Sequence, residues 1–122
     1  MPATIILLED DDLVSELFQV ALEVHGYNVV CARNSKDIVK LVQHWNPVLV
    51  ITDLMMPEHE GMEGIFNLST VSDVPVIAMS TNPAWLKLAE NLVTRTLRKP
   101  LCAEFLLENV WQVLEANATR SG

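Results

Sequence analysis

The sequence is poor in basic residues and has no long apolar run, and each shortage excludes a class of protein. Its 122 residues hold only 8 Lys and Arg against 16 Asp and Glu, for a net charge of −8. Without surplus cations, the chain is unsuited to binding the phosphates of nucleic acid or an anionic membrane surface. Its apolar runs are far shorter than the roughly 20 residues that cross a bilayer. Half the residues are hydrophobic, which is typical of a folded chain, and the length suits one domain.

Cysteine is also scarce, and its spacing carries no motif. Cys31 and Cys102 are the only two cysteines, and neither has CxxC spacing or a cluster of metal-ligand residues near it in the sequence. We expect free, half-buried thiols, which fit a reducing compartment. No basic segment precedes an apolar run at residues 1–8, so no secretory signal is indicated. These features together predict a cytoplasmic protein.

Short apolar runs alternate with helical patterns along the rest of the chain. The apolar runs predict strands over residues 4–8, 27–32, 48–52, 74–79 and 96–98, and the periodic segments predict helices over 12–25, 34–45, 61–69, 83–92 and 102–116. Strands that are apolar on both faces are typical of a parallel sheet covered by helices on each side. The pattern therefore predicts an α/β fold, with an open, doubly wound, five-stranded parallel sheet in a three-layer sandwich.

Apolar residues repeat at helical spacing in the first and last of these helices. The repeat in the first helix consists of Leu13, Leu17, Ala21 and Val24, and the apolar face of the last consists of Phe105, Leu106, Val110, Val113 and Leu114. Asp11 or Asp12 can cap the first helix, and Gly26 can end it.

Polar side chains follow four of the five predicted strands, at the edge where ligands bind in such sheets. They are Glu9, Asp10, Asp11 and Asp12 after the first strand, Asp53 after the third, Ser80 after the fourth and Lys99 after the fifth. Carboxylates held close together resist ionisation, and Mg²⁺, which prefers oxygen ligands, relieves that repulsion. With a lysine and a hydroxyl alongside, such a set can hold a phosphoryl group and offer an aspartate as its acceptor.

These segments resemble the receiver domain of two-component response regulators over almost the whole chain. The resemblance rests on residues 6–11, 52–57 with Gly61, 75–80 and 99–100, which occur in this order at successive strand ends. It implies a flavodoxin-like (βα)5 fold with Asp53 as the phosphoacceptor. It also implies a Mg²⁺ site made by Glu9, Asp10, Asp53 and the backbone carbonyl of Met55. Ser80 and Lys99 would contact the phosphoryl group, and the Lys99–Pro100 bond would be cis.

Two features of the sequence leave alternatives open. In the run of four acids, Asp11 competes as a metal neighbour, or Asp11 and Asp12 serve mainly as helix caps. The segment between Ser80 and Lys99 is shorter than is usual in the family, and Thr96 stands where many receivers have an aromatic residue. Thr81 likewise replaces a small residue. We therefore expect phosphorylation chemistry to survive while the switch through the fourth helix and fifth strand is altered.

The predicted function is that of a phosphoacceptor in signal transduction, not a turnover enzyme. Residues 1–118 would form the receiver domain and 119–122 a short tail, with no effector domain. The expected partner is a sensor histidine kinase or a histidine phosphotransfer protein, and a homodimer through the last two helices is a further expectation. The alternative is a phosphorylation-independent scaffold or dimerisation module. An aspartyl-phosphate phosphatase is disfavoured because Met55 stands where such enzymes carry a second Asp.

Overall fold

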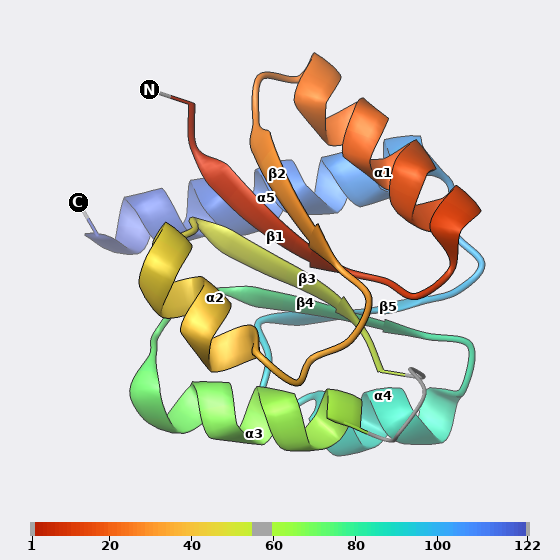
Figure 1. The fold of residues 1–122 in the computed structure, drawn as a ribbon, viewed down its shortest axis with the longest axis vertical. Helices are drawn as coiled ribbons and strands as arrows, with labels where there is room; N and C mark the ends of the chain where they lie inside the picture. The colour runs from red at the N-terminus through yellow and green to blue at the C-terminus, as the bar shows by residue number, and fades with distance from the viewer. Residues whose placement is uncertain (1, 55–59, 122) are drawn as a thin grey trace.

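The structure is a computed structural model that describes residues 2–54 and 60–121. Five parallel strands form one sheet in the order β2-β1-β3-β4-β5, and they all point the same way (Figure 1). The elements are β1 (Thr4–Leu8), α1 (Asp12–Val24), β2 (Asn28–Ala32), α2 (Ile38–Trp45), β3 (Leu49–Asp53), α3 (Glu60–Val71), β4 (Val76–Ser80), α4 (Pro83–Ala89), β5 (Arg95–Arg98) and α5 (Ala103–Ser121). The predicted doubly wound α/β fold is confirmed.

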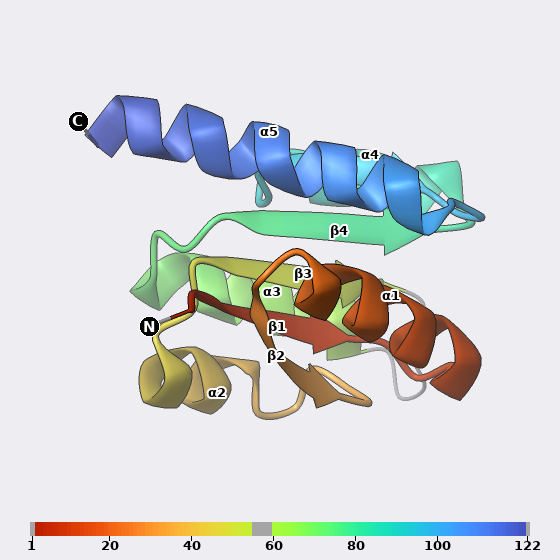
Figure 2. The same ribbon diagram turned by 90° about the horizontal axis from the view of Figure 1, so that it is seen from above.

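Helices cover both faces of this sheet in three layers. Figure 2 looks onto one face and shows α1 in front of the strands and α3 behind them. Ile5 and Leu7 of β1 belong to the core cluster shared with α1 and α5, whereas Ile6 and Leu8 belong to the cluster shared with α2 and α3. Successive side chains of a strand point to opposite faces, so a strand with helices on both sides must be apolar throughout. The same rule explains why residues 4–8 show no polar alternation.

Most of the apolar repeat noted in the first helix faces away from the core. Leu13, Leu17 and Val24 are 80%, 55% and 75% exposed, whereas Phe18 and Leu22 are buried against the sheet. The helix carries two neighbouring apolar rows, and the row with the larger aromatic side chain is the one that packs. Spacing alone does not distinguish such rows, because both repeat at three and four residues.

The last helix also differs from its prediction at both its face and its end. Phe105 is exposed, while Leu106, Val110 and Val113 of the predicted face are buried. The helix continues to Ser121, beyond the predicted end at residue 116, because no Gly or Pro interrupts the segment before residue 122.

Local signals place the other helix ends. Asn34 accepts a hydrogen bond from the Lys36 N–H in a turn that delays α2 until Ile38. Gly26 adopts a φ of +92° just past α1, a conformation open to glycine. Cys31 and Cys102 are exposed residues, not half-buried as expected, and Cys31 lies on β2, a strand at one side of the sheet. In the described part of the chain, no helix is long and apolar enough to span a membrane.

Candidate metal and phosphoacceptor site

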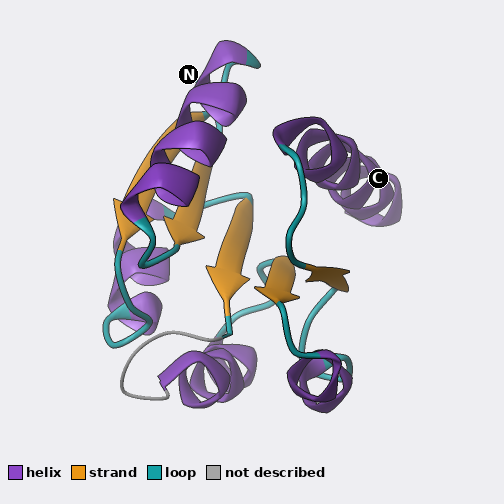
Figure 3. Cartoon of the chain, turned by 90° about the vertical axis from the view of Figure 1, so that its right-hand side faces the viewer, coloured by secondary structure: helices purple, strands orange, loops and turns teal. Residues whose placement is uncertain are grey.

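The parallel register brings the strand-end residues to one edge of the sheet, which Figure 3 views from the carboxyl ends of the strands. Leu8 of β1 pairs with Thr52 of β3. Glu9 and Asp53, the residues that come next in the chain, therefore lie side by side. Asp53 in turn pairs with Met79 of β4, which places Ser80 one residue further along. The site is therefore assembled by strand pairing rather than by a single loop.

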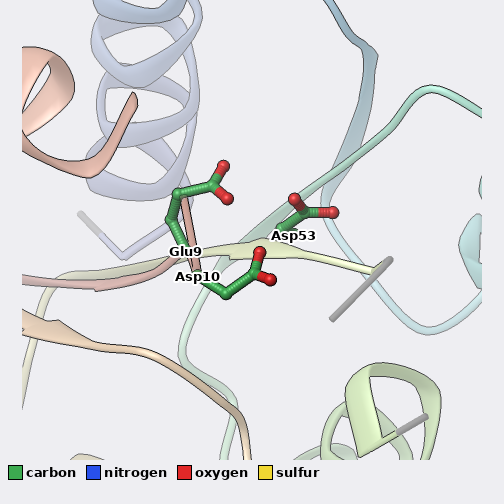
Figure 4. Close-up of side chains that lie close together, drawn as sticks. All are labelled: Glu9, Asp10 and Asp53. Carbon is green, nitrogen blue, oxygen red and sulfur yellow. The ribbon is translucent and has the colours of Figure 1, made fainter. Parts of the chain in front are cut away.

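Three carboxylates gather at this edge. One oxygen from each of Glu9, Asp10 and Asp53 lies within 4.8 Å of the other two, and Figure 4 shows these side chains together at the ends of β1 and β3. Glu9 and Asp53 are only 2% and 4% exposed. Buried carboxylates at this separation repel one another, and the all-oxygen donor set suits a hard divalent cation such as Mg²⁺. The residues present therefore fit the metal that the sequence predicts.

Lys99 supplies the positive charge that the buried acids share. Its Nζ donates hydrogen bonds to Glu9 Oε1 at 2.7 Å and to Asp53 Oδ2 at 2.8 Å, and the lysine side chain is 16% exposed. Burial opposes the charge on Lys99, but the hydrogen bonds to Asp53 and Glu9 outweigh burial and raise the lysine pKa. One ammonium group thus holds the first and third strands of the site together.

Glu9 is the acid whose environment opposes its ionisation. Its pKa is raised mainly by burial and further by the neighbouring Asp53 carboxylate, although hydrogen bonds from Lys99 and from the Asp11 N–H act in the opposite direction. A single lysine is therefore too little to compensate both buried acids. An added cation would remove the remaining repulsion.

The structure separates the members of the acid run. Asp11 caps α1, because its Oδ1 accepts from the Leu13 N–H at 3.0 Å and the Val14 N–H at 3.1 Å. The Asp12 carboxylate is paired with Arg33. Glu9 and Asp10 are thus the pair gathered with Asp53, and the two following acids serve the helix and a surface ion pair.

Ser80 lies at the same end of the sheet, at the end of β4. Ser80 is fully buried, and its Oγ accepts a hydrogen bond from the Asn82 N–H at 3.0 Å. The Lys99 N–H donates to the Ser80 carbonyl at 2.9 Å, which links β4 to the segment after β5. The Lys99–Pro100 bond is cis, as the resemblance implies. Met55 lies outside the described residues.

Comparison with known proteins decides the family. The chain matches the sequence family of the response regulator receiver domain over residues 5–110. The chain belongs to this family. The receiver domain is also 28% identical over 126 aligned positions to a curated protein named response regulator MprA from Mycolicibacterium vanbaalenii, with all of this chain and 54% of that protein covered. The chain thus spans about half the length of the curated relatives it matches.

Solved structures agree on the fold of this receiver domain. A CheY-like receiver domain protein from Methanospirillum hungatei superposes with a TM-score of 0.90 at 18% identity, covering 98% of this chain and 99% of that chain. The chemotaxis response regulator CheY4 of Vibrio cholerae gives a TM-score of 0.83 at 22% identity, covering 93% of this chain and 99% of that chain. These similarities support the flavodoxin-like (βα)5 arrangement.

Two residues near the site of the receiver domain were missed by the sequence prediction. Arg33 follows β2 and contacts the acid run, and Asn82 caps α4 by accepting from the Ala84 N–H. Asn82 stands directly before Pro83, which is a recognisable helix-start signal. Arg33 offers no such signal, because its partners lie 21 and 23 residues away in the sequence.

Proposed function

We propose that Asp53 accepts a phosphoryl group from a sensor histidine kinase or a histidine phosphotransfer protein. The observation that carries this proposal is the buried Asp53 carboxylate, which is held by Lys99 and gathered with Glu9 and Asp10. Glu9, Asp10 and Asp53 would hold Mg²⁺, with the Met55 carbonyl as the further ligand that the family resemblance implies. When bound, Mg²⁺ supplies positive charge to the oxygens of the phosphoryl group.

The reaction is a displacement at phosphorus. An Asp53 oxygen forms a bond to phosphorus while the bond from phosphorus to the donor imidazole nitrogen breaks, and that nitrogen takes up a proton from solvent. The product is an acyl phosphate on Asp53. The domain thereby modifies itself and turns over no separate substrate.

Lys99 and Ser80 would stabilise the new negative charge. The Lys99 ammonium lies 2.8 Å from Asp53 Oδ2, so a phosphoryl group on Asp53 forms within reach of it. A cation held beside the reacting oxygens stabilises the charge of the transferring group. The Ser80 hydroxyl already accepts from the Asn82 N–H, which leaves its proton free to donate to a phosphoryl oxygen.

The surface beside the site suits a partner with an apolar helix. An exposed apolar row runs along α1, which begins where the acid run ends; it consists of Leu13, Leu17, Val20 and Val24. A protein that delivers a phosphoryl group to Asp53 must cover this edge of the sheet, and the row offers it a contact surface. A homodimer through α4 and α5 is a separate proposal, supported by the exposed apolar side chains of Leu88 and Trp111.

Labelling with a small phosphodonor tests the proposal. With Mg²⁺ present, intact mass should show one labile phosphoryl group on the wild-type chain and none on Asp53→Asn. Asp73→Asn is the matched control, because Asp73 is an exposed acid that precedes the amino end of β4, whereas the site lies at the carboxyl ends of the strands. Unchanged labelling of Asp53→Asn would refute the acceptor assignment.

The second candidate function is a phosphorylation-independent scaffold. It is favoured by Thr96, which stands on β5 where many receivers carry an aromatic residue, so the usual aromatic link to the site is absent at this position. Failure of the wild-type chain to label with both the small donor and a cognate kinase would favour the scaffold.

A further inference from the structure

Arg33 joins the end of β2 to the acid run that follows β1. Its Nη1 donates to the Asp12 carboxylate, and its Nη2 donates to the backbone carbonyl of Asp10 at 3.3 Å. The residue before it takes part as well, because the Ala32 carbonyl accepts from the Glu9 N–H at 3.0 Å. The end of β2 thus holds the segment that carries two of the three gathered acids.

The far side of the same segment is held by the start of α1. Asp11 accepts from two N–H groups of the first helical turn, which ties its position to the helix. The Asp10 residue therefore lies between a helix cap on one side and the Arg33 contacts on the other. Of these two restraints, only the guanidinium acts directly on the backbone of Asp10.

We propose that Arg33 is a positioning residue for the acid cluster, which keeps the Asp10 carboxylate beside Glu9 and Asp53. The inference rests on the proposed function, because it takes the cation of that cluster to be Mg²⁺. A planar guanidinium suits this task, since its fork of donors reaches a carboxylate and a carbonyl at once. Residues that orient a metal ligand commonly set the affinity of the site without touching the metal.

The direction in which loss of Arg33 changes Mg²⁺ affinity distinguishes a positioning role from a purely electrostatic one. A positive charge near a cation site repels the cation, so charge alone predicts that loss of Arg33 strengthens Mg²⁺ binding. Positioning predicts the reverse, because an unrestrained Asp10 must be ordered when the cation binds. The Arg33 side chain is 68% exposed, so solvent and salt weaken the repulsion, and we expect positioning to dominate.

Calorimetric titration of the whole chain with MgCl₂ measures whether Mg²⁺ affinity falls or rises in each variant. Arg33→Ala should weaken Mg²⁺ binding about tenfold, the low end for loss of a residue that orients a ligand. Arg33→Lys keeps the positive charge but loses the forked guanidinium donors, so its Mg²⁺ affinity should lie between those of the wild type and Arg33→Ala. Lys36→Ala is the matched control, because it removes an exposed positive charge three residues further on and should leave affinity unchanged or slightly higher.

Equal or tighter Mg²⁺ binding by Arg33→Ala, with a wild-type thermal transition, would overturn the positioning role. If Arg33→Ala does not fold, equal or tighter Mg²⁺ binding by Arg33→Lys would overturn the positioning role in the same way. A second readout is the Mg²⁺ dependence of labelling on Asp53: the deficit of Arg33→Ala should vanish at saturating Mg²⁺, and a persistent deficit would contradict the inference. Absence of Mg²⁺ binding by the wild-type chain is a different result, which would overturn the proposed function itself.

Discussion

The two sides of the site are held by different kinds of contact. On the acid side, formed by the ends of β1 and β3, Glu9 and Asp53 are buried and both accept from the Lys99 ammonium. On the response side, formed by β4, α4 and β5, Ser80 accepts from the Asn82 backbone, and Asn82 caps the helix. Charge pairing organises the first side, and neutral hydrogen bonds along the chain organise the second.

We expect this difference to separate the phosphorylation chemistry of the domain from its response. The acid side gathers Glu9, Asp10 and Asp53, and Lys99 reaches it from the end of β5. On β5 itself, Thr96 stands where many receivers have an aromatic residue. Ser80 is nevertheless connected to α4, through the two hydrogen bonds of Asn82. We therefore expect changes on the acid side to alter phosphorylation, and changes at Asn82 to alter α4 alone.

The largest effect should come from Lys99. Lys99→Ala removes the cation that both buried acids share, so labelling of Asp53 by a small phosphodonor should slow about a hundredfold. Lys87→Ala is the control, because Lys87 pairs with Glu90 on the exposed surface of α4. A rate for Lys99→Ala within twofold of the wild type would show that the acid side works without its lysine.

Replacement of Glu9 should have opposite effects on metal binding and on stability. Glu9→Gln removes a carboxylate of the cluster, so Mg²⁺ affinity should fall about tenfold or more. The same change should raise the unfolding free energy of the metal-free chain, because burial opposes ionisation of Glu9 and glutamine carries no charge to bury. Calorimetry and urea unfolding measure the two effects, with the exposed Glu16→Gln as control. A loss of stability would contradict this account of the acid side.

On the response side, the expected change is smaller and local. Asn82→Ala removes the side chain that accepts from the Ala84 N–H, which should lower the unfolding free energy by about 1 kcal/mol. Amide exchange should increase in α4, while labelling of Asp53 stays at the wild-type rate. Asn91→Ala, at an exposed position after α4, is the control. Impaired labelling of Asn82→Ala would show that the two sides are not separable.

The smallest effect is a dependence of stability on alkaline pH. Lys99 has a raised pKa in the folded chain, because its hydrogen bonds to the acids outweigh its burial. The folded chain therefore holds this proton more tightly than the unfolded chain, and the stabilisation is fully present below the ordinary lysine value of 10.5. It should be lost as pH rises above that value. Urea unfolding of wild type and Lys99→Met in metal-free buffer checks this, and identical pH profiles would contradict it.

Much of the fold and site follows from local sequence. The run at residues 4–8 predicts a strand buried on both faces, and β1 occupies those residues. The strand-end positions of Glu9, Asp53, Ser80 and Lys99 follow from parallel topology, because it places all carboxyl ends at one edge. Such features are predictable because they depend on neighbours within a few residues and on a fixed direction of the strands.

Other features required the packed chain. Spacing in the first helix does not tell Leu17 from Phe18, and only the fit against the sheet buries the latter. The acid run does not reveal which carboxylates turn toward Asp53 until Asp11 caps the helix and Asp12 meets Arg33. The sequence by itself thus determined the parallel fold and the chemistry available at one edge of the sheet. Only the tertiary structure decided which groups meet there, because those contacts join residues far apart in the chain whose side chains have several possible partners.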